Sequence, residues 1–372
     1  MIISAPNQTR QNEHRVALTP DAVRSLIGDG HTVHIELSAG TAAGYPDEAY
    51  VEAGATMVDN PWTADVVAVV NPPTSEARAS LRNGAIVVGL LRPLDEPGGI
   101  AQLAKTGVTS LAFETLPRIT RAQSMDALSS QATAVGYQAV LEAADRLPRF
   151  LPMLTTAAGT IRPAKALVLG AGVAGLQAIA TARRLGAVVS AFDVRSAAAE
   201  QVESLGAKFI EAVTAPQDAS TSGGYAKELA TDDQAIIVAN LAPHITDSDM
   251  VISTAQIPGR QAPILITAET VRAMRPGSVI VDTAAATGGN CALTKPGETV
   301  VTHGVTIIGD LDLASRVAGD ASQMYARNVT TLLKLALEND PIDLSDEVLA
   351  GCAVTHQGKI TNERVRAMLE EA

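Results

Sequence analysis

The sequence predicts an α/β protein in which two domains with parallel sheets are joined by long helices. The chain has 372 residues, which is long for one hydrophobic core and suits two. Hydrophobic residues make up 47% of the chain and aromatic residues 3%, so its cores are expected to consist of Ala, Val, Leu and Ile. Strand and helix signals also alternate along its first third, which is typical of an α/β unit.

The first 120 residues contain short apolar segments that indicate strands, and helices are expected between them, for example over 20–29. No phosphate-binding glycine loop accompanies these segments. We therefore expect an α/β domain that holds no nucleotide phosphates of its own. The predicted strands are 1–4, 32–37, 66–70, 85–90 and 109–112.

A long helix follows, because apolar or small residues recur three and four positions apart, as on the buried face of a helix. We expect it to connect the two domains. The residues that mark its face are Leu128, Ala132, Val135, Ala139 and Ala143.

A dinucleotide-binding motif, G-x-G-x-x-G, lies between a predicted strand at 166–169 and a predicted helix at 173–185. In this setting Gly170 permits a tight turn, Gly172 lets the backbone approach a pyrophosphate, and Gly175 lets the helix pack closely on the strand. The amino end of the helix then presents free N–H groups to the phosphates. The motif predicts a Rossmann-like domain.

An acidic residue, Asp193, directly follows the next predicted strand, 188–192. It lies 18 residues beyond Gly175. A carboxylate at this place accepts hydrogen bonds from the adenosine ribose and repels a 2′-phosphate, so NAD is favoured over NADP. Arg195 is the one neighbour that does not suit this interpretation. The remaining predicted nucleotide contacts are Val173, Ala174 and Val194.

Later strands are expected at 250–254, 278–282 and 306–309, and a second long helix is expected from 315 to 337. This helix would return the chain to the first domain. We therefore predict a discontinuous first domain, 1–130 with 320–372, around a nucleotide-binding domain at 131–319, with NAD in the cleft between them. One polar, glycine-rich stretch at 214–225 is expected to be a mobile loop that closes over the nucleotide.

Composition excludes several classes of partner. The net charge of −12 argues against nucleic acid and against an anionic membrane surface. The two cysteines, Cys291 and Cys352, have neither disulfide nor metal-ligand spacing, and we expect no metal site. No apolar run approaches the length of a membrane span and no secretory leader is recognised, so a soluble protein of the cytoplasm is expected.

Several segments taken together resemble the NAD(H)-binding domain I of proton-translocating nicotinamide nucleotide transhydrogenases, of the alanine dehydrogenase/transhydrogenase superfamily. The resemblance covers nearly the whole chain. Its strongest segments are P-R-I-T-R-A-Q-S-M-D-A-L-S-S-Q-A at 117–132, M-L-T-T-A-A-G-T at 153–160, the glycine motif at 170–187, D-V-R at 193–195, E-Q-V-E-S-L-G at 200–206, G-G-Y-A-K-E at 223–228 and G-G-N-C at 288–291.

The resemblance implies roles for individual residues. Arg118, Asp126 and Ser129 would position the nicotinamide, and Gln123 would lie where two nicotinamides meet. The tyrosine of the family's mobile loop matches Tyr225, which follows Gly223 and Gly224. Direct hydride transfer needs no general acid or base, so orientation and exclusion of water are what such side chains supply.

The resemblance also implies partners. Domain I of this family passes a hydride between NADH and NADP(H) held by a separate domain III, while membrane subunits couple the exchange to proton movement. We accordingly expect a transhydrogenase of the proton-translocating Re/Si type rather than the Si-specific type, active only with its partner subunits. A homodimer, peripheral on the cytoplasmic face of the membrane, is implied as well.

Two alternatives remain at this point. Alanine dehydrogenase shares the opening pattern E-x-R-V-A-L-T-P at 13–20, but its catalytic lysine and histidine align with Asn71 and Arg92, which cannot shuttle protons near neutral pH. Its carboxylate-binding arginine matches Arg15, for which we expect a structural ion pair. An NAD-responsive binding module without hydride transfer is the other alternative.

The sequence departs from the transhydrogenase pattern in two segments. The segment 232–249 matches the family poorly in composition, and the segment 281–291 differs just ahead of its two glycines. Ala286 and Thr287 precede Gly288 and Gly289, where many members carry a glutamate. This change concerns details of the loop beneath the nicotinamide rather than NAD binding itself.

Overall fold

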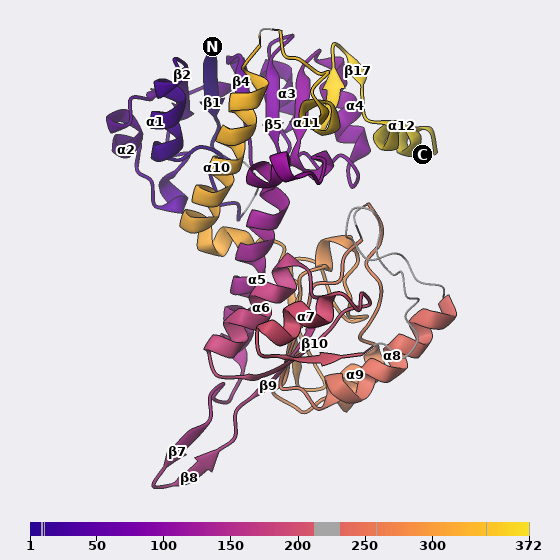
Figure 1. The fold of residues 1–372 in the computed structure, drawn as a ribbon. Helices are drawn as coiled ribbons and strands as arrows, with labels where there is room; N and C mark the ends of the chain where they lie inside the picture. The colour runs from indigo at the N-terminus through magenta and orange to yellow at the C-terminus, as the bar shows by residue number, and fades with distance from the viewer. Residues whose placement is uncertain (9, 11, 212–230, 258, 340, 372) are drawn as a thin grey trace. The chain divides into compact units, whose positions relative to one another are not determined.

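The computed structural model describes all residues except 9, 11, 212–230, 258, 340 and 372 (Figure 1). The chain divides into two compact units, one formed by 1–131 with 314–372 and the other by 132–313. One boundary falls inside α5 (Ala127–Arg146) and the other inside the short helix η6 (Leu313–Val317).

The described part of the first unit is built on an eight-stranded sheet with the order β17-β16-β6-β5-β4-β1-β2-β3. The strands from β6 to β3 are parallel, and β16 and β17 extend the sheet in antiparallel fashion. Parallel strands in the order 3-2-1-4-5-6 form a doubly wound sheet. Successive strands are added on one side of β1 up to β3, and from β4 onward they are added on its other side. The strands are β1 (Ile2–Ala5), β2 (Thr32–Glu36), β3 (Thr56–Val58), β4 (Val66–Ala68), β5 (Ile86–Gly89), β6 (Thr109–Ala112), β16 (Ala353–His356) and β17 (Lys359–Ile360).

Helices cover this sheet, and their ends follow local sequence signals. Pro20 opens α1, Thr74 caps α3 through the Ala77 N–H, and Asp346 caps α11 through the N–H groups of Val348 and Leu349. The helices are α1 (Pro20–Gly28), α2 (Asp47–Glu52), α3 (Ser75–Ser80), α4 (Pro97–Lys105), α10 (Ala318–Ala336), α11 (Glu347–Cys352) and α12 (Glu363–Glu371), with the short helices η1 (Thr41–Ala43), η2 (Pro61–Thr63), η3 (Phe113–Thr115) and η4 (Thr120–Met125).

The core of the first unit places one tyrosine at the carboxyl ends of two strands. Tyr325 of α10 is fully buried, and its hydroxyl donates to the Val69 carbonyl at 2.7 Å and accepts from the Leu90 N–H at 3.1 Å. Its ring meets Phe113 edge to face. The helix that comes late in the sequence thus holds the ends of β4 and β5 at a fixed separation.

The described part of the second unit has a seven-stranded sheet with the order β11-β10-β9-β12-β13-β15-β14, in which only β14 runs antiparallel to its neighbour. This is again the doubly wound order, with the reversal between β9 and β12. The strands are β9 (Lys165–Leu169), β10 (Val188–Phe192), β11 (Lys208–Ile210), β12 (Met250–Ser253), β13 (Val279–Asp282), β14 (Thr299–Thr302) and β15 (Val305–Ile308).

The second unit is covered by α6 (Val173–Arg184), α7 (Ala198–Ser204), α8 (Thr231–Thr246) and α9 (Ala268–Ala273), with η5 (Ala285–Thr287) after β13. Its two apolar clusters consist mostly of Ala, Val, Leu and Ile, as the composition predicts. A hairpin of β7 (Leu154–Thr156) and β8 (Gly159–Ile161) projects away from the sheet (Figure 1).

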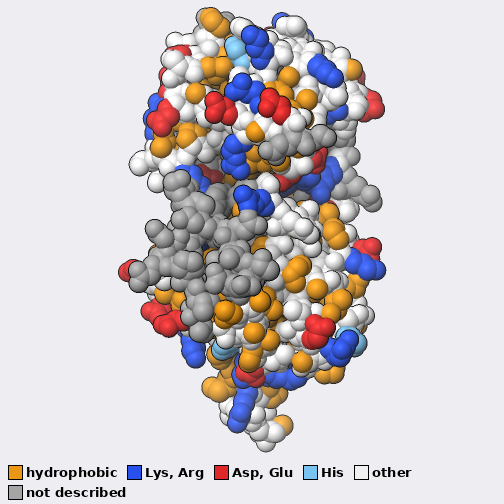
Figure 2. Space-filling model, turned by 90° about the vertical axis from the view of Figure 1, so that its right-hand side faces the viewer, with side chains coloured by type: hydrophobic (Ala, Val, Ile, Leu, Met, Phe, Trp, Pro, Cys, Tyr) orange, Lys and Arg blue, Asp and Glu red, His pale blue; other side chains and the backbone are white. Residues whose placement is uncertain are grey.

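The predicted fold class, an α/β protein with two Rossmann-like domains and mostly parallel sheets, is confirmed. None of the helices within the described residues is long and apolar enough to cross a bilayer. On the face drawn in Figure 2, the described basic and acidic side chains are interspersed and form no continuous basic stripe of the kind that binds nucleic acid.

Candidate functional site

The glycine loop between β9 and α6 has the geometry of a phosphate cradle. Gly170 has φ +95°, which only glycine adopts readily. A Cβ added to Gly175 would lie 1.8 Å from the Gly170 carbonyl oxygen, so the third glycine is required for helix and strand to approach. A Cβ on Gly172 would meet no atom within 4 Å. The second glycine therefore faces open space at the amino end of α6, where a pyrophosphate would approach.

A buried polar cluster behind this loop fixes the adjacent loops of the same sheet edge. The Thr254 hydroxyl lies 3.0 Å from the Gly170 carbonyl and 3.2 Å from the Leu169 carbonyl, both of which accept. The Asn290 side chain accepts from Ser253 Oγ at 2.7 Å and donates to the carbonyls of Ala255 and Pro263, both at 2.8 Å; no part of it is exposed.

Asp282 anchors the other side of Asn290. Its Oδ2 accepts from the N–H groups of Asn290 and Cys291 and from the Thr294 hydroxyl, at 2.8, 3.0 and 2.6 Å. Sequence reasoning assigned no role to Thr254, Asp282 or Asn290; the signal that could have found the last two is an acid at a strand end followed by G-G-N. Ala286 and Thr287 lie in η5 on this same loop, exposed and half-buried respectively.

The predicted ribose acid, Asp193, is buried at the carboxyl end of β10. Its Oδ2 accepts from the Ala171 N–H at 2.7 Å, which fixes the carboxylate beside the glycine loop. The Arg195 guanidinium donates to both oxygens of Asp193, from Nε to Oδ1 and from Nη2 to Oδ2, each at 2.8 Å. The side chain that did not suit an NAD site is thus a partner of the acid itself. Of the other predicted contacts, Val173 is exposed, and Ala174 and Val194 are half-buried.

The residues predicted to position the nicotinamide lie on η4 and at the start of α5. Arg118 and Gln123 are exposed, and Asp126 and Ser129 are half-buried. The structure brings the last two together: the Asp126 carboxylate accepts from the Ser129 N–H at 2.9 Å and from the Ser129 hydroxyl at 2.6 Å. Asp126 therefore caps α5, which is a structural role that the sequence could not separate from a nucleotide contact.

The predicted mobile loop cannot be placed in this site. Gly223, Gly224 and Tyr225, like the rest of the segment 214–225, lie outside the described residues. Their contacts with a nucleotide therefore stay predictions.

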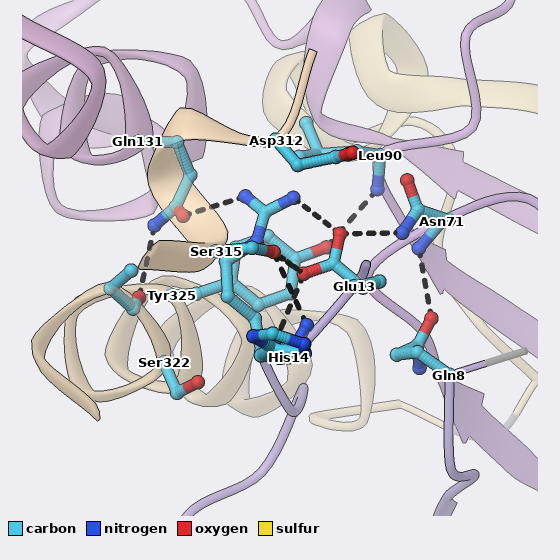
Figure 3. Close-up of polar contacts among 12 residues, drawn as sticks. Gln8, Glu13, His14, Asn71, Leu90, Gln131, Asp312, Ser315, Ser322 and Tyr325 are labelled. Atoms are coloured by element: carbon cyan, nitrogen blue, oxygen red, sulfur yellow. Dashed lines mark hydrogen bonds and ion pairs between the residues drawn. The ribbon is translucent and has the colours of Figure 1, made fainter. Parts of the chain in front are cut away.

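A buried carboxylate, Glu13, organises the first unit near the carboxyl ends of β1 and β4 (Figure 3). Arg15 donates to both of its oxygens, through Nε at 2.8 Å and Nη2 at 2.7 Å, and uses Nη1 for Gln131 Oε1 at 2.8 Å. The Asn71 amide donates to Glu13 at 2.7 Å, and the Ser315 hydroxyl donates to it as well. Each of the three guanidinium nitrogens of Arg15 thus donates to a group of the first unit, and Arg15 forms the expected ion pair with Glu13.

Opposing influences set the pKa of Glu13. Burial by itself raises the pKa of this carboxyl, but the hydrogen bonds and charge of Arg15, with smaller contributions from Ser315 and Asn71, outweigh burial and lower the pKa to about 2. Glu13 is therefore ionised at all physiological pH values. Sequence reasoning singled out Arg15 but not its partner.

Asn71 and Arg92 line a cavity of about 280 Å³ at the edge where β1, β4 and β5 end. Arg92 has φ +52° and its backbone N–H donates to Glu114 at 2.7 Å. The Leu91 N–H donates to the second oxygen of Glu114 at 3.2 Å, and burial raises the pKa of Glu114 to about 7. Glu114 thus holds the turn after β5. Asn71 and Arg92, the positions that align with the dehydrogenase's catalytic pair, bring an amide and a guanidinium to the cavity, neither of which exchanges protons near neutral pH.

Comparisons with known proteins agree on one family. The chain matches "Alanine dehydrogenase/PNT, N-terminal domain" over residues 5–135 and "Alanine dehydrogenase/PNT, C-terminal domain" over 139–363. It is 45% identical to the first polypeptide of the NAD(P) transhydrogenase alpha subunit of Rhodospirillum rubrum, over 97% of this chain and 98% of that protein. It is 32% identical to alanine dehydrogenase of Bacillus subtilis, over 78% of this chain and 72% of the enzyme. A solved transhydrogenase structure from Sinorhizobium meliloti superposes with a TM-score of 0.85 at 43% identity, over 98% of this chain and 99% of that one.

We predict that Glu13→Gln lowers the free energy of unfolding by about 3 to 5 kcal/mol at pH 7, because it removes the charge that pairs with buried Arg15. The folded-state pKa lies below the unfolded value of about 4.5, so the wild-type advantage is complete above pH 4.5 and is lost as the pH falls toward 2. Urea unfolding at pH 7, 4 and 3 measures this. The exposed Glu48→Gln is the control, and a Glu13→Gln profile parallel to the wild type would contradict the assignment.

Proposed function

Because the chain belongs to the alanine dehydrogenase/PNT family, we propose that it is the NAD(H)-binding subunit of a proton-translocating transhydrogenase. In this proposal it passes a hydride directly between NADH and NADP held by a partner subunit. The family membership confirms the resemblance predicted from the sequence. The observation that carries the proposal is the glycine loop, which leaves Gly172 in open space beside a carboxylate fixed for a ribose.

The described residues fit a dinucleotide. The N–H groups of the first turn of α6 and the uncovered backbone of Gly172 would hold the pyrophosphate, and Asp193 would accept from the adenosine ribose. Bound NADH supplies the hydride. The backbone bond from Ala171 keeps the Asp193 carboxylate in place beside the glycine loop, where it would also accept from a ribose hydroxyl.

We propose that NAD(H), rather than NADP(H), occupies this chain. A 2′-phosphate would meet the Asp193 carboxylate at the ribose position, and the charge of Arg195 is already taken up by that carboxylate. NADP(H) would then be bound by the partner subunit, as the predicted exchange requires.

The segment 118–129 would orient the nicotinamide. Arg118, Asp126 and Ser129 offer a guanidinium, a carboxylate and a hydroxyl for the nicotinamide carboxamide, and Gln123 offers an uncharged amide at the partner contact. None of these groups must move a proton, because a hydride passes between two carbon atoms held about 3 to 3.5 Å apart. The protein's task is then alignment and exclusion of water.

Alanine dehydrogenase activity is disfavoured by the same structure. A 2-oxo acid needs a free cation for its carboxylate and a group that exchanges protons at the imine. Arg15 is paired with Glu13 and bonded to Gln131 from a side chain that is 11% exposed, and Asn71 and Arg92 supply no such proton. The greater similarity to the transhydrogenase, 45% against 32%, points the same way.

We propose that separate membrane subunits couple the exchange to proton movement and hold this chain on the cytoplasmic face of the membrane. We also propose a homodimer. The segment around the β7–β8 hairpin supports this, because Phe150, Met153 and Ile161 are 55, 63 and 42% exposed. Arg149 fixes the base of the hairpin by donating to Asp249 at 2.8 Å and to the Arg162 carbonyl at 3.0 Å. A second copy of the chain would cover these apolar side chains.

Gly172→Ala tests nucleotide binding at the glycine loop. Because its Cβ meets no protein atom, the variant should keep the wild-type melting temperature, while the new methyl group occupies the approach of the pyrophosphate. We predict a Kd for NADH raised about tenfold or more, a loss of about 1.4 kcal/mol. Fluorescence titration measures Kd.

Gly98→Ala is the matched control for Gly172→Ala, because its Cβ also meets open space, on α4. Titration of the wild type with NADPH tests the nucleotide preference. An unchanged NADH affinity in Gly172→Ala, or equal affinities for NADH and NADPH in the wild type, would count against the site as described.

The proposed reaction is tested by mixing the purified chain and NADH with an NADP-binding domain III and an NADP analogue. Transfer is expected in the mixture and not with the chain alone. Gln123→Asn should slow transfer about tenfold or more with NADH affinity retained, because shortening an orienting side chain misplaces the reacting atoms. The exposed Gln102→Asn on α4 is the control. NADH binding without transfer in the mixture would favour the binding module, and turnover of pyruvate and ammonia would favour the dehydrogenase.

The homodimer is tested by sedimentation at micromolar concentration. We predict a dimer for the wild type and a monomer for Met153→Asp, because the substitution places a charge in the apolar contact. Val51→Asp is the control, since Val51 is an apolar side chain of similar exposure, 56%, on α2 of the first unit. A monomeric wild type would overturn this part of the proposal.

A further inference from the structure

The segment that carries the proposed hydride-transfer residues has only short-range backbone bonds of its own. The N–H groups of Ile119, Ala122 and Asp126 donate to carbonyls two or three residues earlier. Such bonds shape the turn of η4 but do not fix its place on the unit. Two buried side chains, Ala122 and Met125, dock its apolar side on the core that includes α10. Apolar contacts have no direction, so these two leave rotation and sliding of the segment open. Arg121 of η4 adds a surface tether, because its Nη2 donates to Asp346 Oδ2 at 2.6 Å from a side chain that is 52% exposed.

The side-chain amide of one buried residue fixes the orientation of this segment from inside the unit. Asn328 of α10 is 8% exposed, and its Nδ2 donates to the Ser124 carbonyl at 2.9 Å. Its Oδ1 accepts from the Ser130 hydroxyl at 2.7 Å. Ser124 follows Gln123 in the chain, and Ser130 follows Ser129. A single side chain therefore joins the two segments on which the proposed residues stand, across 204 and 198 positions of sequence.

We propose that Asn328 is a positioning residue for hydride transfer, whose side-chain amide sets the spacing between η4, with Gln123, and the first turn of α5, with Asp126 and Ser129. This inference rests on the proposed function. The positioning role explains why the polar residue Asn328 lies on the buried face of α10, near the core residues Tyr325, Val329 and Leu332.

The helix that carries Asn328 is suited to act as a reference. α10 spans Ala318–Ala336, and most of one face is buried in the core of the first unit. It grips α5 at a second point, where its Ala321 carbonyl accepts from Gln131 Nε2 at 3.0 Å. Residues 321 and 328 are seven apart, which puts them two turns apart on the same face. Gln131 is held in turn by Arg15, so the start of α5 is fixed at two neighbouring residues.

The rate of hydride transfer depends steeply on the spacing between η4 and the first turn of α5. Transfer between two carbon atoms at about 3 to 3.5 Å loses on the order of a hundredfold in rate when a distant change shifts one reactant by about 1 Å. A change at Asn328 should therefore slow the transfer step. It should leave NADH affinity nearly intact, because the glycine loop and Asp193 belong to other segments.

The test compares Asn328→Leu and Asn328→Asp with the wild-type chain, in the mixture with domain III at saturating NADH. Leu keeps the branched shape and the number of heavy atoms, with a larger volume, and removes both bonds, whereas Asp keeps the acceptor for Ser130 and loses the donor to Ser124. We expect transfer to slow about ten- to a hundredfold in Asn328→Leu, somewhat less in Asn328→Asp, and the Kd for NADH to change less than about threefold. Ser130→Ala, alone and combined with Asn328→Leu, should show that the two effects are not additive.

Thr330→Val is the matched control. Thr330 lies on the same helix with the same exposure, 8%, and its hydroxyl donates only to the Ala326 carbonyl of its own helix. Its substitution should leave the transfer rate within about twofold of the wild type. Amide hydrogen exchange of residues 118–130 gives a second readout that needs no partner, and exchange there should quicken in Asn328→Leu but not in Thr330→Val.

The outcomes separate the two proposals. Two outcomes would overturn the inference and leave the proposed function standing. In the first, the wild type transfers hydride and Asn328→Leu transfers it at the same rate. In the second, Thr330→Val slows transfer as much as Asn328→Leu does. NADH binding without wild-type transfer would overturn the proposed function and the positioning role with it. Unchanged exchange of residues 118–130 in Asn328→Leu would show that the amide does not fix the segment, and this too would overturn the inference.

Discussion

The second unit depends on backbone approaches that leave no room for a side chain. The Gly170 carbonyl lies where a Cβ of Gly175 would be, and the Ala174 carbonyl lies 2.0 Å from where a Cβ of Gly136 would be. α5, the first turn of α6 and the turn after β9 are thereby stacked at the shortest separation that a polypeptide allows. Thr254 closes the stack from the β12 side. Gly172 lies between these close approaches, and a Cβ placed on it would meet no atom within 4 Å.

Two carboxylates in the chain repeat one motif with different consequences. Glu13 and Asp193 each pair with the arginine two residues later, accept its backbone N–H, and receive its guanidinium on both oxygens. At Glu13 the pair is closed, because the arginine side chain is 11% exposed and its remaining edge binds Gln131. At Asp193 the arginine reaches solvent and the acid lies beside the glycine loop. The same pairing thus lies inside the core at one position and beside the glycine loop at the other.

Sequence reasoning succeeded where structure is local. The glycine motif, the strands of Val, Ile and Leu around it, and the helix after it are specified within about 30 residues, and the predicted helix 173–185 differs from α6 by one residue. It missed the hairpin β7–β8 and the edge strands β14 and β17, which are short and largely solvent-facing. The hubs at Glu13, Asn290 and Asn328 were missed because their partners lie tens to hundreds of positions away. The roles of the residues at 118–129 in hydride transfer stay predictions. Asp126 and Ser129, for example, could be selected either for capping α5 or for contacting a nucleotide, and the sequence does not separate the two roles.

The first unit is made of two stretches of sequence that share one core. α10 contributes Tyr325, Val329 and Leu332 to that core, and β16 pairs with β6 across more than 240 positions. During synthesis, residues 1–131 therefore emerge without the helix and strand that complete them, and the whole second unit follows before these arrive. At typical elongation rates this interval is on the order of 10 to 40 s. The sequence of the second unit is therefore complete on the ribosome while the first unit still lacks α10 and β16.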